Sequence, residues 1–565
     1  MAVEKLIVDH IDTWTTALQT RSTAGRGSSG KIDLYGIKKL RELILELAVR
    51  GKLVPQDPND EPASELLKRI AAEKAELVKQ GKIKKPKPLP EISEEEKPFE
   101  LPEGWEWVRF GSIYEMEYGN NLPQEKRSNS GEYDVYGSNG IVGTHNEACI
   151  KSPCIVIGRK GSAGALNLSD QAACWVTDVA YSTIPPSAMN LEFVFIQFHT
   201  LGLDTLGKGI KPGLNRNDAY NLTIAIPPQS EQKAIVSKVN EMMTLCDQLE
   251  QHSLTSLDAH QQLVETLLTT LTDSQNAEEL AENWARISKH FDTLFTTEAS
   301  IDALKQAILQ LAVMGKLVPQ DPNEEPASEL LKRIAQEKAQ LVKDEKMKKQ
   351  KPLQPISCDN IPFNLPENWV WCRFGNIVKN LSNGLYKPES HYSNDGIISL
   401  RMYNIQNGII DFTDVRRVKV TELERYKYIL EEGDLLINRV NSKELVGKTA
   451  IIPKTKEPLL FESMNMRACL FKEIINSHYI NTLFQSEFIK KELSLYAKEA
   501  ISQASINQQQ ITELLIPLPP SIEQKNIVDK VNLLLSLLEQ VKYCMGKIKN
   551  TQVHLADALT DAAIN

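Results

Sequence analysis

The 565-residue sequence lacks several features that would define its class at once. Its eight cysteines form no CxxC pair, since even Cys149 and Cys154 are five positions apart, which excludes a zinc ribbon and disfavours a disulfide framework. No stretch approaches the roughly 18 uninterrupted apolar residues of a membrane-spanning helix. The first residues also lack the basic and then apolar layout of a signal peptide. Together these absences predict a cytoplasmic protein.

Signatures of catalysis are missing as well. No Pro-Pro pair stands in the Asp/Asn-Pro-Pro-aromatic motif that a methyltransferase acting on base amino groups would carry. Gly447-Lys448-Thr449 resembles the end of a phosphate-binding loop, but Ser442 stands where the first glycine is required. The nine histidines form no metal-binding spacing. We therefore expect no metal, no cofactor and no catalysis in this chain.

An excess of basic residues is also lacking. The chain has 65 Lys and Arg against 74 Asp and Glu, a net charge of −9. Proteins that bind nucleic acid mainly through phosphates are usually basic. Bulk charge alone therefore disfavours a DNA-binding protein, and any contact with nucleic acid must be local or shared with a basic partner.

What the sequence does contain is a long internal repeat, which organises the whole chain. Residues 47–79 recur at 311–343 with only four of 33 positions changed (50, 60, 72 and 76). LPEGWEW at 101–107 recurs as LPENWVW at 365–371, and PPQSEQK at 227–233 recurs as PPSIEQK at 519–525. A near-identical frame thus encloses two blocks, 101–228 and 365–520, whose sequences hardly resemble each other.

The concentration of divergence in these two blocks is informative. Two copies that drift together would diverge over all of their surfaces. Divergence confined to two blocks therefore indicates that the differences between the blocks serve the function of the protein. The alternative interpretation is that both blocks merely tolerate change. Short apolar runs such as 154–157 and 434–437 lie between Gly, Asn and Ser turns. Each block is therefore predicted to be a small α/β domain with an irregular sheet.

A long helical pattern follows each block. In the second copy, apolar residues recur at alternating steps of four and three, the 3.5-residue period of a coiled coil. Two stripes in the same register predict that the helices at 230–272 and 521–559 pack on each other. The predicted seam residues are Ile235, Val239, Met242, Cys246, Leu249, Ile527, Val531, Leu534, Leu538 and Val541.

The frame segments 37–50 and 64–79 also show helical periodicity. Gly51 is suited to the end of the first of these helices, and Ser64 to the N-cap of the second. The Pro- and charge-rich stretches 81–98 and 344–362 are typical of linkers.

The two blocks offer polar, turn-rich chemistry that suits DNA recognition. Glycine lets a backbone approach a ligand closely, Asn or Gln pairs with adenine, and Arg or Lys binds guanine or phosphate. For any single residue, a solvated turn is an equally good interpretation. The candidates in the first block are Tyr136, Ser138, Asn139, Arg159, Lys160, Ser162, Lys208, Lys211, Asn215 and Arg216. Those in the second are Arg401, Asn404, Arg439, Asn441, Lys443, Gln503, Asn507 and Gln508.

With these motifs in view, the chain resembles the specificity (S) subunit of type I restriction-modification systems along essentially its whole length. The resemblance is carried by the repeated GKLVPQDP, the Trp-x-Trp at the start of each block and the Pro-Pro…Glu-Gln-Lys before each long helix. YGSNGIVGTHN and IGRKGSAG look like a recurring type of target recognition domain, and the ending LADALTDAAIN looks like the type IB subfamily. The second block has no obvious counterpart of the YGSNG and GRKGS runs, so its candidates are weaker.

The resemblance implies an α+β fold in which two α/β target recognition domains are joined by two long antiparallel coiled-coil helices, with a pseudo-twofold internal repeat. It implies that each domain reads one half of a split double-stranded DNA site and that the helices set the spacer. Two modification subunits would carry S-adenosylmethionine and methylate adenine N6, and two restriction subunits would use ATP and Mg²⁺. The expected segments are a helical region with its linker at 1–100, the first recognition domain at 101–228, a long helix at 229–300, a repeated helical region at 301–364, the second recognition domain at 365–520 and a long helix at 521–565.

Two other classes of function compete with this interpretation. A scaffold that binds only proteins would use the same repeated helices, and a gel-shift assay on duplex DNA distinguishes it. An enzyme in its own right is disfavoured by the missing motifs.

Overall fold

The computed structural model describes residues 3–21, 31–81, 83, 88–207, 213–500 and 503–564. The chain divides into two compact units, each treated separately below. Among the described residues, unit 1 takes in those up to Thr255 together with 549–564, and unit 2 takes in 256–548. No helix within the described residues is both long and apolar enough to cross a membrane.

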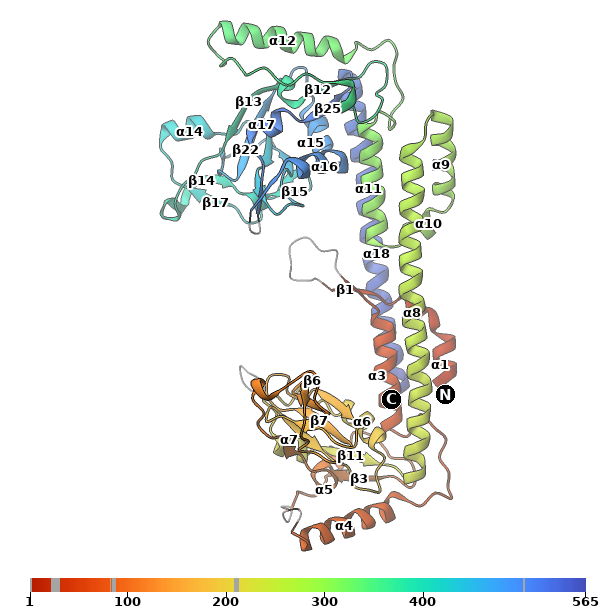
Figure 1. Cartoon of the computed structure of the whole chain (residues 1–565). Coiled ribbons are helices and arrows are strands. Elements are labelled where there is room, and N and C mark those ends of the chain that lie inside the picture. The colour runs from red at the N-terminus through yellow and green to blue at the C-terminus, as the bar shows by residue number, and fades with distance from the viewer. Residues whose placement is uncertain are drawn as a thin grey trace. The chain divides into compact units, whose positions relative to one another are not determined.

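Unit 1 combines frame helices with one α/β domain, called domain 1 here (Figure 1). The frame elements are α1 (Val3–Asp9), α2 (Ile11–Thr16), β1 (Gln19–Arg21), β2 (Lys31–Asp33), α3 (Tyr35–Val49), α4 (Ala63–Lys79) and η1 (Glu94–Glu96). Domain 1 contains β3 (Glu106–Arg109), α5 (Phe110–Ile113), β4 (Glu117–Tyr118), η2 (Gln124–Lys126), β5 (Tyr133–Gly137), β6 (Gly140–His145), β7 (Cys154–Gly158), β8 (Leu166–Ser169), β9 (Trp175–Val176), β10 (Ala180–Thr183), α6 (Leu191–His199), α7 (Arg216–Tyr220) and β11 (Thr223–Ile226). The long helix α8 (Gln229–Asp273) follows.

Unit 2 repeats this plan with a larger α/β domain, domain 2 (Figure 1). Its frame elements are α9 (Ala277–Lys289), α10 (Phe291–Leu294), α11 (Glu298–Val313), α12 (Ala327–Lys343) and η3 (Cys358–Asn360). Domain 2 begins with β12 (Val370–Arg373), α13 (Phe374–Ile377), β13 (Val378–Asn383), η4 (Glu389–His391), β14 (Tyr392–Leu400), η5 (Met402–Asn404), β15 (Ile405–Gln406), β16 (Ile409–Ile410), β17 (Arg416–Val418), α14 (Glu422–Tyr428) and β18 (Leu435–Asn438). It continues with β19 (Val440–Asn441), β20 (Thr449–Ile451), β21 (Leu459–Phe461), β22 (Asn465–Leu470), α15 (Ser477–Gln485), α16 (Glu487–Tyr496), β23 (Lys498–Ala500), β24 (Gln503–Ser505), α17 (Gln508–Thr512) and β25 (Leu515–Leu518), before the long helix α18 (Ser521–Ile564).

The two domains share one sheet topology although their sequences differ. A four-stranded antiparallel sheet runs β4-β10-β7-β8 in domain 1 and β13-β22-β18-β20 in domain 2. A three-stranded sheet runs β6-β5-β9 in one and β17-β14-β21 in the other, each with one parallel pair. The pairs β3–β11 and β12–β25 close the domains. Two α/β domains, two long helices and an internal repeat confirm the predicted fold class.

The central strands of both sheets are apolar because each is covered on both faces. All five residues of β7 and all four of β18 are buried, which accounts for the unbroken apolar runs in the sequence. The predicted frame helices at 37–50 and 64–79 are confirmed as α3 and α4. Gly51 ends α3 with a φ of +66°, as expected, but Pro62 occupies the N-cap of α4, so the prediction for Ser64 is wrong.

Each long helix contributes to both units, because α8 passes from unit 1 into unit 2 and α18 passes the other way. In unit 2, residues 264–271 of α8 share one apolar cluster with Ile527, Val531 and Leu538 of α18 and with α11. Equivalent lysines of the repeat mark the helix ends: Lys52 Nζ donates to Ile564 O in unit 1, at 2.7 Å, and Lys316 Nζ to Thr272 O in unit 2, at 2.8 Å.

The predicted seam is largely buried. Ile235, Val239, Met242 and Cys246 are buried in unit 1, whereas Ile527, Val531 and Leu538 are buried in unit 2, and Leu249, Leu534 and Val541 are half-buried. In unit 1, Arg41 of α3 donates to Asp247 and Glu250 beside the seam, at 2.7 and 2.8 Å. In each copy the seam thus lies beside a frame helix, α3 in unit 1 and α11 in unit 2, and in unit 2 it also shares an apolar cluster with the other long helix.

The three repeated motifs meet in one buried joint in each unit. In unit 1, Glu231 at the start of α8 accepts hydrogen bonds from Trp105 Nε1, at 2.8 Å, and Gln56 Nε2, at 2.7 Å. In unit 2, Glu523 accepts from Trp369 Nε1, at 2.9 Å, and Gln320 Nε2, at 2.6 Å. Burial raises the pKa of both carboxyl groups. The GKLVPQDP, Trp-x-Trp and Glu-Gln-Lys motifs are thus joined because together they fasten a domain to its long helix.

Candidate nucleic-acid interface

In domain 1 the two predicted glycine-containing turns meet at the end of strand β7. Gly158 is the last residue of β7, and a Cβ there would lie 2.0 Å from Ser162 O and 2.5 Å from Ser138 O. Only glycine fits in this space, so it allows the GRKGS run to contact the YGSNG run. The structure thus brings Ser138 and Ser162 together, and both are half-buried.

An exposed tyrosine lies beneath two arginines next to these turns. The guanidinium carbon of Arg159 is 5.0 Å from the ring centre of Tyr118, and that of Arg216 is 4.8 Å from the same ring. Both distances are within the range of cation–π attraction. Tyr118 is 52% exposed and packs on Tyr181 at 5.1 Å between ring centres. Sequence analysis missed Tyr118, because a two-residue strand carries no pattern that would single it out.

The other candidates of domain 1 fall into three groups. Asn139 and Lys160 are exposed on the two turns. Asn215 is exposed and caps α7, where its side chain accepts from Asn217 N at 3.0 Å. Lys208 and Lys211 lie outside the described residues.

Tyr136 does not belong to this surface. It is 6% exposed and forms part of an apolar cluster with Cys154, Val156 and Cys174, and burial raises its pKa. The predicted contact of Tyr136 with DNA is therefore wrong, and the residue supports the turn from beneath.

Domain 2 has a structural counterpart of Arg159, contrary to the impression that its sequence gives. Arg159 N donates to Val179 O, at 2.9 Å, and Arg159 O accepts from Leu214 N, at 2.9 Å. Arg439, which follows β18, makes the same pair of bonds, donating to Met464 O at 2.8 Å and accepting from Ile506 N at 3.0 Å. Because β7 and β18 hold the same place in their sheets, the two arginines occupy equivalent backbone positions.

The tyrosine–arginine contact of domain 1 has a polar counterpart in domain 2. Gln508 Nε2 donates to Asn383 Oδ1 at 3.2 Å. Asn383 is exposed at the end of β13, and Gln508 begins α17, which Asn507 caps by accepting from Gln510 N at 3.0 Å. Asn383 was not predicted, since an isolated Asn in a polar stretch is indistinguishable from a solvated turn.

Arg401 follows β14, the strand equivalent to β5, and so stands where the YGSNG turn stands in domain 1. Its guanidinium carbon is 5.4 Å from the Tyr403 ring and 6.0 Å from the Tyr392 ring. Its Nε donates to Glu462 Oε2 at 2.9 Å. Glu462 is only 8% exposed, so this ion pair holds the arginine at the strand end.

Two predicted contacts in domain 2 are corrected by burial. Asn404 is 1% exposed, and its amide donates to Asp411 O and Asp414 O, at 2.9 and 3.1 Å. Asn441 is 9% exposed and donates to Asn438 Oδ1 at 2.9 Å. Both amides are used inside the domain, so the predicted base contacts are wrong. Lys443 and Gln503 are exposed.

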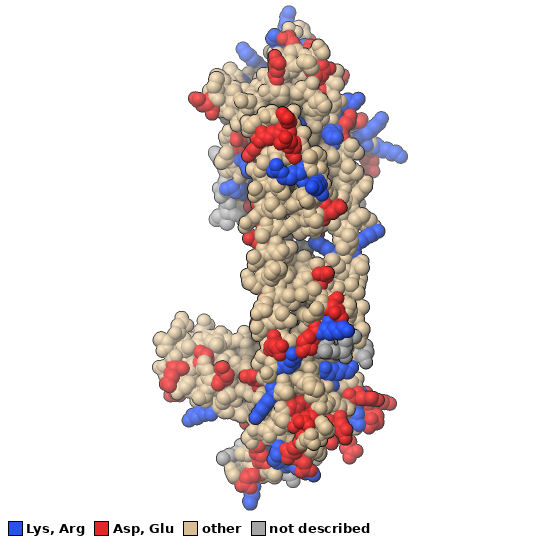
Figure 2. Space-filling view, turned by 90° about the vertical axis from the view of Figure 1, so that its right-hand side faces the viewer, with Lys and Arg blue, Asp and Glu red and all other residues tan. Residues whose placement is uncertain are grey.

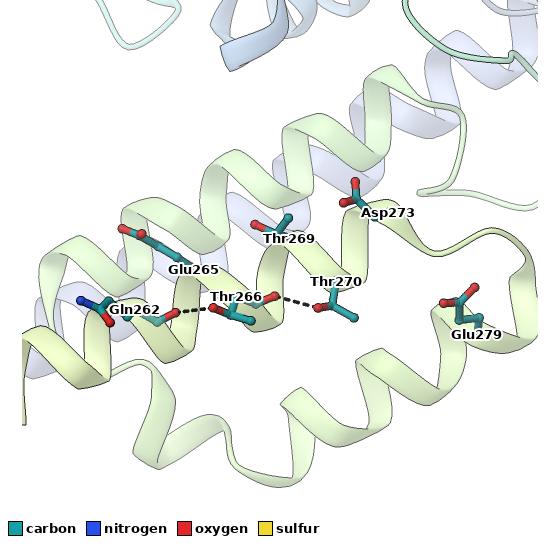
Figure 3. Close-up of a pocket in the computed structure, with 7 residues that line it drawn as sticks. All are labelled: Gln262, Glu265, Thr266, Thr269, Thr270, Asp273 and Glu279. Atoms are coloured by element: carbon teal, nitrogen blue, oxygen red, sulfur yellow. Dashed lines mark hydrogen bonds between the residues drawn. The ribbon is translucent and has the colours of Figure 1, made fainter.

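Acidic and basic side chains are intermixed on the face of the molecule that Figure 2 shows. A hollow of about 650 Å³ lies between α8 and α9 in unit 2 (Figure 3). Its Thr266 and Thr270 hydroxyls donate to carbonyls of their own helix, so their protons are not available to a ligand. No cluster of His, Cys, Asp and Glu in the described ranges is arranged to hold a metal ion.

Comparisons with known proteins agree on one family. The sequence matches the family described as "Type I restriction modification DNA specificity domain" twice, over residues 102–259 and 366–542. It is 50% identical to the type I restriction enzyme EcoAI specificity subunit of Escherichia coli and 47% identical to the EcoEI specificity subunit of Escherichia coli, with 100% of each chain covered in both cases. A chain from a solved structure of the type I R-M system aligns over 83% of this chain and 99% of its own, with 17% identity and a TM-score of 0.47.

Proposed function

The chain belongs to the family of type I restriction-modification DNA specificity subunits, and on this basis we propose that domains 1 and 2 each read one half of a bipartite DNA site. One observation carries the proposal. Two domains of dissimilar sequence, held in a near-identical frame, present polar and cationic side chains from the same strand ends and the same short helix. Such an arrangement suits two readers of different sequences that must be held in the same way.

The side chains at least partly exposed at these positions have the chemistry that base recognition requires. Arg159, Arg216, Arg401 and Arg439 offer guanidinium donors, and Gln508 and Asn383 offer amides. Arg matches the acceptors of guanine in the major groove, and Asn or Gln matches adenine. Because the whole chain has a net charge of −9, much of the phosphate neutralisation must come from other subunits.

We further propose that the chain is itself non-catalytic and acts in the cytoplasm. Two modification subunits would supply S-adenosylmethionine chemistry at adenine N6, and two restriction subunits would supply ATP- and Mg²⁺-dependent cleavage. The long helices α8 and α18, of 45 and 44 residues, would set the spacer between half-sites. At about 1.5 Å per residue each is about 65 Å long, enough to exceed one turn of DNA, about 34 Å.

Exchange of a domain tests this function. Residues 105–225 are replaced by the recognition domain of a relative, and the chain is produced with its modification subunit. Single-molecule sequencing of the host DNA should show one half of the methylated motif changed, with the other half and the spacer retained. A change in both halves contradicts separate reading. If the methylated motif does not depend on the sequence of either block, the chain would instead be a scaffold that binds only proteins. Methyl transfer by the purified chain alone would refute the non-catalytic role.

A further inference from the structure

One pair of positions recurs in both domains and carries different chemistry in each. The first position lies at the end of the outer strand of the four-stranded sheet, where domain 1 has Tyr118 and domain 2 has Asn383. The second is the first residue of the short helix before the closing strand, Arg216 or Gln508. In each domain the two side chains meet, across 4.8 Å from guanidinium to ring and 3.2 Å from amide to amide.

Backbone packing fixes both positions independently of these side chains. Each strand residue is followed by a glycine that lies against the backbone of the neighbouring segment. A Cβ at Gly119 would come within 2.1 Å of Thr177 O, and one at Gly384 within 2.2 Å of Glu462 O. Each helix residue follows an asparagine N-cap, Asn215 or Asn507. The frame around the pair is therefore constant, whereas the pair itself differs.

We infer that this strand–helix pair is a specificity-determining position in each domain, reading guanine through Arg216 in domain 1 and adenine through Gln508 in domain 2. The inference rests on the function proposed above. In domain 1, Arg216 Nη1 donates to Met116 O at 3.1 Å, and the Tyr118 ring lies against the guanidinium. These contacts orient the planar guanidinium, so that its remaining N–H donors can bind the two acceptors of guanine, O6 and N7.

In domain 2, the partner orients an amide instead of a guanidinium. Asn383 accepts one N–H of Gln508 Nε2, so the second N–H and Oε1 stay available. One donor beside one acceptor matches N7 and the N6 amino group of adenine. The pair in domain 2 is neutral, so it adds little to the charge attraction that dominates phosphate binding, and this favours a base contact at the shared position.

The test transplants the domain 2 pair into domain 1. The full-length variant Y118N/R216Q is produced with the modification subunit, and its methylated motif is compared with that of the unchanged chain and of K151Q, which alters an exposed lysine of the same domain. We expect one position of the domain 1 half-site to change from guanine towards adenine, with preference for guanine reduced roughly tenfold to a hundredfold. The other half-site and the spacer should stay as they are, and K151Q should keep the full motif.

Each other outcome has a defined meaning. An unchanged motif, or an even loss of methylation without a change of base, overturns the inference. If the unchanged chain itself yields no bipartite motif, the proposed function fails instead. If the double variant does not assemble with the modification subunit, R216M decides, because it keeps an unbranched side chain but has no hydrogen-bond donor for guanine. Relaxed preference at one position supports the inference, and a full retention of guanine overturns it.

Discussion

The joint formed by Glu231 allows a quantitative test of how a domain is fastened to its long helix. Glu231 is 4% exposed, and its carboxylate accepts from Trp105 Nε1 and Gln56 Nε2. Replacement by alanine leaves the buried donor Trp105 Nε1 without this acceptor, at about 1–3 kcal/mol, whereas the exposed Gln56 can bind water instead. Trp105 also keeps a longer bond to Gln56 Oε1, at 3.2 Å. We therefore expect E231A to lower the free energy of unfolding of unit 1 by about 1–3 kcal/mol.

Hydrogen exchange measured by mass spectrometry is the suitable assay, because a chain of two units does not give one two-state transition. Peptides from α3 and the start of α8 should exchange about 5- to 150-fold faster in E231A. Peptides from α11 and α12 should keep their protection. E523A should show the reverse pattern, since Glu523 forms the same joint in unit 2. Unchanged protection in unit 1, or an equal loss in both units, would refute this account of the joint.

The charge of Glu231 gives the same joint a pH dependence. Burial is the main cause that raises its pKa above 4.5. In the interval above pH 4.5 the folded chain thus binds more protons than the unfolded chain, so the contribution of Glu231 to stability falls as pH rises through that interval. E231Q can keep both hydrogen bonds if the Gln56 amide turns over. Its unit 1 protection should therefore differ less between pH 4.5 and pH 7 than that of the unchanged chain.

Three further outcomes follow from the packing and the surface. I527A truncates a fully buried side chain in the unit 2 cluster and should lower the free energy of unfolding of unit 2 by about 2–5 kcal/mol. I522A, at a position 64% exposed, should stay within about 0.5 kcal/mol, and hydrogen exchange of unit 2 peptides compares the two variants. A hydrogen bond from Arg109 is the main cause that lowers the pKa of Glu96 to about 2, so this contact should persist at neutral pH and be lost as pH falls from 4.5 towards 2. Pepsin should then cut the segment around Glu96 less readily in the unchanged chain than in E96Q at pH 4, and equal cutting would contradict the contact. R159A should weaken DNA binding by about 1–3 kcal/mol with relaxed preference at one base pair, measured by fluorescence anisotropy with the modification subunit; an even loss across all sequences would indicate a phosphate contact instead.

Periodicity and repetition predicted the frame well, because local spacing determines which face of a helix is apolar. The helices α3 and α4 and the long helices were predictable from residues such as Leu40, Leu66 and Val531, which recur at helical spacing and are buried. The share of α11 in the unit 2 cluster was not predictable, since the pattern of a long helix does not identify which other helices pack on it.

The candidate site was only partly predictable. The meeting of the GRKGS and YGSNG turns follows from Gly158, but the equivalence of Arg159 and Arg439 depends on strand order, which no local motif carries. Asn404 and Asn441 have the composition of surface turns, yet tertiary packing buries them. Tyr118 and Asn383 become meaningful only through their partners on a distant short helix.

The separation between a constant frame and an exposed pair has a consequence for how such a protein evolves. None of Tyr118, Arg216, Asn383 and Gln508 is itself buried, so most substitutions at these positions should change stability by less than about 0.5 kcal/mol. A lineage can therefore explore new target sequences one position at a time while the folded state and the joints at Glu231 and Glu523 stay intact. The base preference of each domain can therefore change without loss of the folded frame.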